Sequence, residues 1–185
     1  MADRFTVLRT NAELRARIAE LAGEISKDYE GRVTEEHPLL LLCTLRGAVF
    51  FAADLARCLT VPAELNFIKV HTYVGMESKL EPAFELGENI PVAGQQVLIL
   101  EDIVDTGRTM DCVVRHYYES GAESVEICTM LDKHKARAEG YEKVVPKYAG
   151  FKIENLFVVG FGLDYDEKFR LLPDVCVYHP DSAQQ

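Results

Sequence analysis

Residues 97–110 read Val97-Leu98-Ile99-Leu100-Glu101-Asp102-Ile103-Val104-Asp105-Thr106-Gly107-Arg108-Thr109-Met110, and the rest of the chain is organised around this stretch. Its first four residues are apolar and mostly branched, which predicts a short strand buried on both faces, as in a parallel sheet. Small polar residues follow and lead into a helical pattern that begins near Thr109. Such a turn exposes backbone N–H groups at the positive end of a helix dipole. The stretch therefore predicts an anion site suited to phosphate.

Side chains in and before the turn can complete this site. Gly107 allows a close approach of the backbone, and the two threonine hydroxyls of the turn add hydrogen-bond donors. The adjacent carboxylates of Glu101 and Asp102 are hard oxygen ligands that can hold Mg²⁺ and the hydroxyls of a sugar. Asp105 supplies a third acid. The alternative interpretation is an ordinary strand–loop–helix unit whose acids are simply solvated.

A second strand–turn–helix pattern lies upstream. Residues 38–43 are largely apolar and predict a buried strand, the turn contains Leu45-Arg46-Gly47, and a helix is expected from Ala48 to about Leu59. Arg46 places a cation beside this second potential anion site. An arginine after a strand is often only a solvated loop charge, so the residues alone leave both interpretations open.

Helices and strands alternate along the rest of the chain. This order predicts an α/β fold with a mainly parallel twisted sheet flanked by helices, and an active site outside the carboxyl ends of the strands. The other expected elements are a helix over 11–31 that begins with capping-box spacing, a strand over 65–70, an irregular stretch over 74–92, a helix over 110–120 ended by Gly121, and strands over 124–131 and 157–160.

Length and composition restrict the class of protein. At 185 residues the chain has the size of one domain. No segment approaches the ~20 apolar residues of a membrane span. The first five residues carry no apolar run, so we expect no signal peptide. Five scattered cysteines without a Cys-x-x-Cys pair, mostly in apolar contexts, predict buried free thiols in a reducing cytoplasm rather than disulfides or a zinc site. The net charge of −10 argues against a general nucleic-acid binder.

The pattern over 97–109 resembles the phosphoribosyl pyrophosphate signature of the type I phosphoribosyltransferases, and Glu-Asp-Ile-Val-Asp-Thr-Gly is most similar to the hypoxanthine-guanine branch. Separated segments between Leu39 and Val177 match this family in the right order. The resemblance implies the type I phosphoribosyltransferase fold in a single domain over 1–185. Its core would lie at about 36–178, and the N-terminal region and C-terminal segments would form a small hood over the purine.

The resemblance also implies a phosphoribosyl pyrophosphate site. Leu45-Arg46-Gly47 matches the family's pyrophosphate loop, which often contains a non-proline cis peptide bond. Glu101 and Asp102 would hold the ribose hydroxyls directly or through Mg²⁺, and residues 105–109 would grip the 5′-phosphate. The full set implied is Leu45, Arg46, Gly47, Glu101, Asp102, Ile103, Val104, Asp105, Thr106, Gly107, Arg108, Thr109 and Arg170.

Later segments would bind the purine. Lys133, just past a strand, matches the family's lysine that recognises the exocyclic O6 of the purine. Phe157 would stack on the base, and Val158 would supply backbone contacts to its edge. Asp164 would contribute to a second Mg²⁺ site, while Arg170 would approach the pyrophosphate. These last two residues are six apart, so their assignment requires a turn between them.

Long irregular segments in compact domains, such as the stretch over 74–92, are usually lids or disordered. The resemblance implies that this stretch is a mobile lid that closes over the reaction. Thr72-Tyr73 is the nearest match to the Ser-Tyr pair that the family carries near the start of its lid. Residues 77–82 read Glu-Ser-Lys-Leu-Glu-Pro and depart from the family's usual Ser/Thr/Gly-rich lid.

The family implies a purine-salvage transferase that joins N9 of a 6-oxopurine (hypoxanthine, guanine or xanthine) to ribose C1 of phosphoribosyl pyrophosphate, with Mg²⁺ as cofactor. Asp105 would accept a proton near N7. The family also implies a homodimer or homotetramer with small-molecule substrates and with neither nucleic acid nor a membrane as partner.

Two alternatives remain open: a non-catalytic regulator that senses phosphoribosyl pyrophosphate, and a transferase for adenine or a pyrimidine. Lys133 favours a 6-oxo group, because an ammonium seeks an acceptor and adenine's amino group is itself a donor.

Overall fold

A computed structural model describes residues 4–74 and 80–179 of the chain. Its main sheet has six strands in the order β4-β3-β2-β5-β6-β7. The pairs from β3 to β7 are parallel, and β4 runs antiparallel to β3. This arrangement confirms the expected α/β fold with a mainly parallel sheet. The strands are β2 (Leu39–Thr44), β3 (Ala63–Val74), β4 (Leu80–Leu86), β5 (Gln96–Val104), β6 (Ser124–Asp132) and β7 (Tyr148–Lys152).

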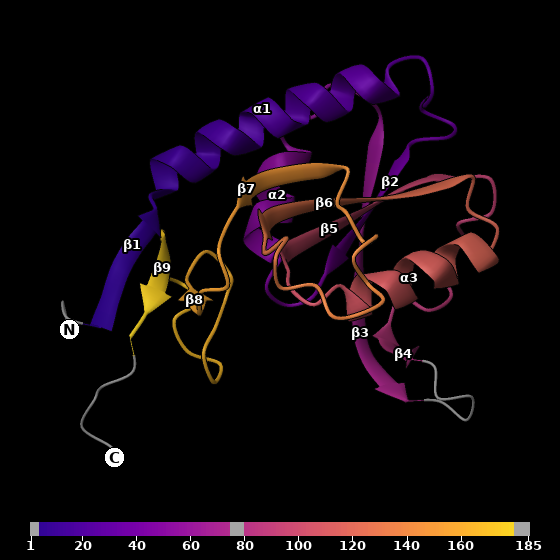
Figure 1. Ribbon diagram of the computed structural model, residues 1–185. Helices are drawn as coiled ribbons and strands as arrows, with labels where there is room; N and C mark the ends of the chain where they lie inside the picture. Colours follow the sequence, from indigo (N-terminus) through magenta and orange to yellow (C-terminus); the bar gives the residue numbers. More distant parts are fainter. Residues whose placement is uncertain (1–3, 75–79, 180–185) are drawn as a thin grey trace.

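Helices cover both faces of this sheet (Figure 1). α1 (Asn11–Tyr29) and α2 (Val49–Ala56) pack on one face, and α3 (Arg108–Glu119) packs on the other. α1 begins at a complete capping box between Thr10 and Glu13, as the spacing predicts. α2 is shorter than the expected 48–59. α3 ends just before Gly121, whose φ of 92 closes the helix. Within the described part of the chain, no helix combines the length and apolar character needed to cross a membrane.

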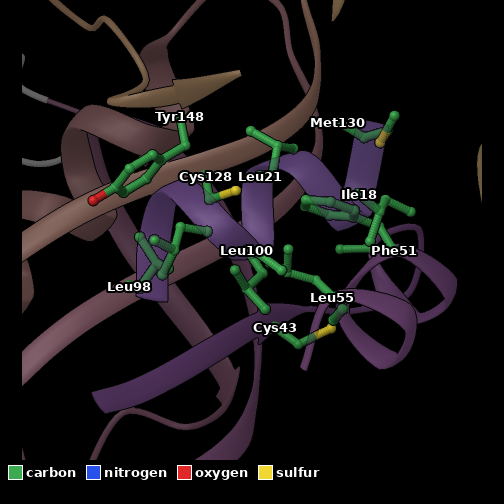
Figure 2. Close-up of a cluster of buried hydrophobic side chains, with 14 of the residues drawn as sticks. Ile18, Leu21, Cys43, Phe51, Leu55, Leu98, Leu100, Cys128, Met130 and Tyr148 are labelled. Atoms are coloured by element: carbon green, nitrogen blue, oxygen red, sulfur yellow. The ribbon is translucent and has the colours of Figure 1, made fainter. Parts of the chain in front are cut away.

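The larger core cluster lies between α1, α2 and the sheet. Figure 2 shows Ile18 and Leu21 of α1 and Phe51 of α2 facing side chains of the central strands. Leu100 of β5 is fully buried there. A fully buried side chain of this size contributes about 1.5–3 kcal/mol relative to an exposed one. A second cluster fills the opposite face under α3. Both faces of β5 are therefore buried, which fixes the strand that leads to the predicted phosphate turn.

β5 extends beyond the four apolar residues that predicted it. It runs from Gln96 to Val104, so Glu101 and Asp102 lie within the strand and do not follow it. The expected end at residue 100 was therefore wrong. The physical reason is the neighbouring strand: β6 continues alongside, and Val104 lies opposite Asp132. Backbone pairing with β6 keeps the chain extended although its side chains have become acidic.

A second, three-stranded antiparallel sheet joins the two ends of the chain in the order β1-β9-β8 (Figure 1). β1 spans Phe5–Arg9, β8 spans Val158–Val159 and β9 spans Val175–Tyr178. Strand periodicity did not predict β1, β7 or β9. The strand expected over 157–160 is reduced to two residues, because Gly160 at φ 95 leaves the extended region.

The stretch over 74–92 contains a strand and is not irregular throughout, which corrects the expectation. β3 continues to Val74, four residues beyond the expected end, and β4 pairs with it. His71 lies opposite Ala83 in this hairpin. The ion pair of Lys69 with Glu85 and the hydrogen bond between His71 and Glu85 cross between the two strands. Such cross-strand pairs cannot be identified from the sequence until the register of the two strands is known. Residues 75–79, part of the expected lid, lie outside the described residues.

Candidate active site

The carboxyl ends of β2 and β5 meet around one cavity of about 300 Å³. This is the edge of the sheet at which parallel α/β folds bind ligands. The lining contains many of the residues predicted to bind phosphoribosyl pyrophosphate: it consists of Thr44, Leu45, Val70, Glu101, Asp102, Ile103, Asp105, Thr106, Gly107, Thr109 and Met110. A second cavity of about 830 Å³ lies beside β3 and β4 and is lined by none of the predicted site residues. Of these two cavities, the smaller one combines acids with the N-terminus of α3.

The turn between β5 and α3 has the geometry of an anion site. Gly107 is the N-cap of α3 and has φ 83, a left-handed conformation that favours glycine. A Cβ at Gly107 would lie 3.1 Å from the Cδ of Arg137 and 3.2 Å from the Cβ of Val144. Because glycine has no side chain to cap the helix, the first backbone N–H groups of α3 are left for a ligand.

The turn after β2 packs directly against the acids of β5. The peptide bond between Leu45 and Arg46 is cis, which the family resemblance had suggested. A Cβ at Gly47 would lie only 1.6 Å from Oδ2 of Asp102, so this position has room for glycine alone. Leu45 and Gly47 therefore lie beside the cavity, whereas the side chain of Arg46 is 61% exposed.

The adjacent carboxylates of Glu101 and Asp102 repel each other. Removal from water and the negative charge of Asp102 raise the pKa of Glu101 well above its usual range. Beneath them, burial and the same two carboxylates raise the pKa of the Cys43 thiol to about 12. A divalent cation would relieve this repulsion, so the pair fits Mg²⁺ with its preference for oxygen ligands. Within residues 4–74 and 80–179, no group of three candidate ligands surrounds one point. Phosphate oxygens and water would complete the coordination.

Asp105 and Lys133 meet beyond the end of β5. Nζ of Lys133 lies 2.8 Å from Oδ2 of Asp105. The lysine side chain is 9% exposed and the aspartate side chain is 45% exposed, so the carboxylate faces the open side of the pair. The two residues come from neighbouring strand ends, and Lys133 N–H donates to the Val104 carbonyl at 3.0 Å. Tertiary structure thus brings the predicted proton acceptor and the predicted purine-recognition lysine together.

The predicted purine side is built from the smaller sheet. Phe157 is 51% exposed and meets Tyr165 edge-to-face with ring centroids 5.5 Å apart. Val158 is buried in β8. Tyr178 of β9 stacks on Tyr165 at 5.0 Å. Phe157 therefore presents an aromatic face, while β8 and β9 hold the backbone beside it.

A turn between Asp164 and Arg170 brings their charged groups to 2.9 Å, as the spacing required. The turn places Asp166 at φ 52 and Glu167 at φ 59. Glu167 pairs with Arg46 at 3.0 Å and with Arg170 at 3.3 Å. The two arginines predicted to meet pyrophosphate thus share one carboxylate. The sequence did not single out Glu167, because no local pattern identifies its two arginine partners.

Comparisons with known proteins agree with this geometry. The family described as "Phosphoribosyl transferase domain" matches residues 7–166. The hypoxanthine-guanine phosphoribosyltransferase of Mycobacterium avium is 37% identical over 183 residues, covering 97% of this chain and 88% of the relative. That of Lactococcus lactis subsp. lactis is 39% identical over 176 residues, covering 95% and 91%.

The chain belongs to the hypoxanthine-guanine phosphoribosyltransferase family.

A solved member of this family has a similar fold. The structure of the Trypanosoma cruzi hypoxanthine phosphoribosyltransferase in complex with the product IMP superimposes with a TM-score of 0.86 at 36% identity, and 94% of each chain is covered. The chain is accordingly a phosphoribosyltransferase with the fold of this family.

Proposed function

We propose that this phosphoribosyltransferase acts in purine salvage, joining N9 of a 6-oxopurine to C1 of phosphoribosyl pyrophosphate and releasing pyrophosphate. The observation that carries the proposal is the ion pair between Lys133 and Asp105, which lies beside the phosphate turn. An ammonium there donates to the O6 acceptor of hypoxanthine, guanine or xanthine. The amino group of adenine would meet the same ammonium as a second donor, which disfavours adenine.

The phosphoribosyl part of the substrate fits the cavity between the two turns. Residues 105–109, with Thr106, Gly107, Arg108 and Thr109, would grip the 5′-phosphate at the N-terminus of α3. Glu101 and Asp102 would hold the ribose hydroxyls, with Ile103 and Val104 providing the strand behind them. Mg²⁺ held by these carboxylates would offset negative charge on the pyrophosphate.

The turn after β2 would contact the pyrophosphate leaving group. Leu45 and Gly47 would approach it with backbone groups, and Arg46 and Arg170 would offset its charge. Asp164 would take part in a second Mg²⁺ site next to the purine. These cations would offset charge on the departing pyrophosphate and so lower the barrier to a transition state with positive charge at C1.

Asp105 would accept the purine proton near N7. An ordinary carboxylate is a weak base at neutral pH, so its position matters more than its basicity. Phe157 would stack on the base and the backbone of Val158 would contact its edge. Thr72 and Tyr73, in the β3–β4 hairpin, would belong to a lid that excludes water during transfer.

The wider setting follows from the family. We expect a homodimer or homotetramer in the cytoplasm, with small-molecule substrates as its partners and with no nucleic acid or membrane. The three-stranded sheet of β1, β8 and β9 would act as the hood over the purine.

The test is pyrophosphate release from phosphoribosyl pyrophosphate and Mg²⁺, assayed in parallel with hypoxanthine, guanine, xanthine, adenine and uracil. We expect turnover with 6-oxopurines alone, and its loss on chelation of Mg²⁺. Turnover of adenine would contradict the base assignment. Tight binding of phosphoribosyl pyrophosphate without turnover of any base would identify a sensor and overturn the enzyme proposal.

A further inference from the structure

Arg137 lies behind the phosphate turn, in the loop that follows β6. Its side chain is only 6% exposed, and its Nη2 forms an ion pair with the carboxylate of Asp132, which is 3% exposed. Its Nε donates to the carbonyl of Val144 at 2.9 Å. A buried guanidinium needs such partners, because an unpaired buried charge is strongly unfavourable.

The remaining nitrogen of Arg137, Nη1, reaches the two strand ends that carry Asp105 and Lys133. Nη1 donates to the carbonyl of Val104, the last residue of β5, at 3.0 Å and to that of the next residue, Asp105, at 2.7 Å. It also contacts the carbonyl of Lys133, at the end of β6, at 3.2 Å. One side chain therefore ties together the backbones of the two residues whose side chains meet at 2.8 Å.

The stem of Arg137 also supports the phosphate turn. A Cβ added to Gly107 would lie 3.1 Å from the Cδ of Arg137, so the arginine packs against the glycine of the turn. Next to it, Ala138 N–H donates to the carbonyl of Thr106 at 3.0 Å. The loop after β6 thus contacts the turn through backbone and side chain alike.

We propose that Arg137 is a positioning residue that holds Asp105 and Lys133 in the geometry needed for purine recognition and proton transfer. This inference rests on the proposed function. A guanidinium presents five N–H donors in one rigid plane and can bond to several carbonyls and a carboxylate at once. A lysine ammonium keeps the charge but is a point donor, so it cannot span the same set of acceptors.

Arg17 provides a matched control for a merely structural role. It too bonds to backbone carbonyls, those of Gly150 at 3.1 Å and Ala149 at 3.0 Å, and pairs with acids of its own helix. It joins α1 to β7 and contacts none of the predicted site residues. Arg17→Lys therefore removes the same kind of bond at a distance from the purine.

The experiment compares steady-state kinetics and thermal unfolding of wild type, Arg137→Lys and Arg17→Lys, with a 6-oxopurine that the wild type turns over. We expect Arg137→Lys to lower kcat by about 10- to 100-fold, because small misplacements of reacting groups are costly. We also expect it to raise the purine KM several-fold. Arg17→Lys should lower Tm and leave kcat within about twofold. Equal kcat for Arg137→Lys and wild type would overturn the inference.

A double-mutant comparison separates positioning from general destabilisation. If Arg137 acts through Asp105, then adding Arg137→Lys to Asp105→Asn should reduce kcat by less than about threefold, because the residue being positioned has already lost its function. Undiminished losses in both backgrounds would show that the arginine does not act through this carboxylate.

Two further experiments test the inference if Arg137→Lys folds poorly: chemical rescue of an alanine variant and a milder substitution at Asp132. Ethylguanidinium at non-denaturing concentration should restore kcat of Arg137→Ala several-fold, while ethylammonium should not. Asp132→Asn keeps an acceptor for Nη2 and should lower kcat to an intermediate degree; an unchanged kcat would count against the inference. A wild type inactive on every base would instead contradict the proposed function itself.

Discussion

The turn between β5 and α3 and the turn at residues 164–170 are both proposed to serve one substrate, yet they are held by different forces. The first follows the buried strand β5 and is fixed by backbone hydrogen bonds and by the buried side chain of Arg137. The second is held by the ion pair of Asp164 with Arg170 and by backbone hydrogen bonds between Tyr165 and Lys168. It also relies on the ion pairs of Glu167, whose side chain is 65% exposed, and it places several non-glycine residues at positive φ.

This difference assigns them different tasks. Buried hydrogen-bonded groups keep one geometry, which suits a phosphate cradle and a proton acceptor. Exposed ion pairs contribute only about 0.2–1 kcal/mol each and weaken in salt, so an incoming anion can replace them at little cost. The rigid turn should therefore dominate the rate, and the exposed turn should tune the affinity for pyrophosphate.

Asp105→Asn should have the largest effect. The amide keeps the shape of the side chain but cannot accept the purine proton, so we expect kcat to fall by about 10²–10⁴-fold. The affinity for phosphoribosyl pyrophosphate, measured by calorimetry, should change little. Asp166→Asn, on the exposed turn, is the control and should leave kcat near the wild-type value. A kcat of Asp105→Asn within threefold of wild type would remove the role assigned to this carboxylate.

Gly47→Ala should come next, because it disturbs the rigid side by contact alone. The new Cβ would lie 1.6 Å from Oδ2 of Asp102 and must displace it. We expect KM for phosphoribosyl pyrophosphate to rise roughly tenfold or more, and stability to fall by about 1–3 kcal/mol. Gly23→Ala in α1 meets nothing within 4 Å and should instead stabilise by about 0.5–1 kcal/mol. Similar effects of the two substitutions on KM would refute the contact.

Phe157→Ala tests the hood side. Stacking of a base on an aromatic ring is worth about 1–3 kcal/mol, so the purine KM should rise about 5- to 100-fold. Because Phe157 is 51% exposed, thermal stability should change little. Tyr118→Ala removes another half-exposed aromatic ring, on α3, and should leave KM unchanged. An unaltered purine KM in Phe157→Ala would mean that the base does not stack there.

Glu167→Gln should have the smallest effect and the opposite sign. It releases Arg46 and Arg170 from their shared carboxylate, so product inhibition by pyrophosphate should tighten by about two- to fivefold at low salt. The gain should fade near ~0.5 M salt, where exposed charges are screened. Inhibition constants at two ionic strengths measure this directly, with Asp166→Asn again as the control. Weaker inhibition in Glu167→Gln would show that the carboxylate does not compete with pyrophosphate.

Local sequence predicted the rigid side well because its elements carry strong periodicity. The run at residues 97–100, the glycine-containing turn and the helix after it all appear, although β5 reaches Val104. The β3–β4 hairpin was partly missed, since its stability depends on pairs such as Lys69 with Glu85 that exist only once the strands meet. β1 and β9, from opposite ends of the chain, were missed for the same reason.

The sequence by itself determined the α/β class, the phosphate turn and the family resemblance, because these depend on residue order within short segments. Only the tertiary structure decided which charges meet. Lys133 forms an ion pair with Asp105, and Glu167 pairs with both Arg46 and Arg170. Arg137 donates hydrogen bonds to carbonyls at two strand ends. These contacts depend on strand order and on long-range packing, and residue spacing along the chain contains neither.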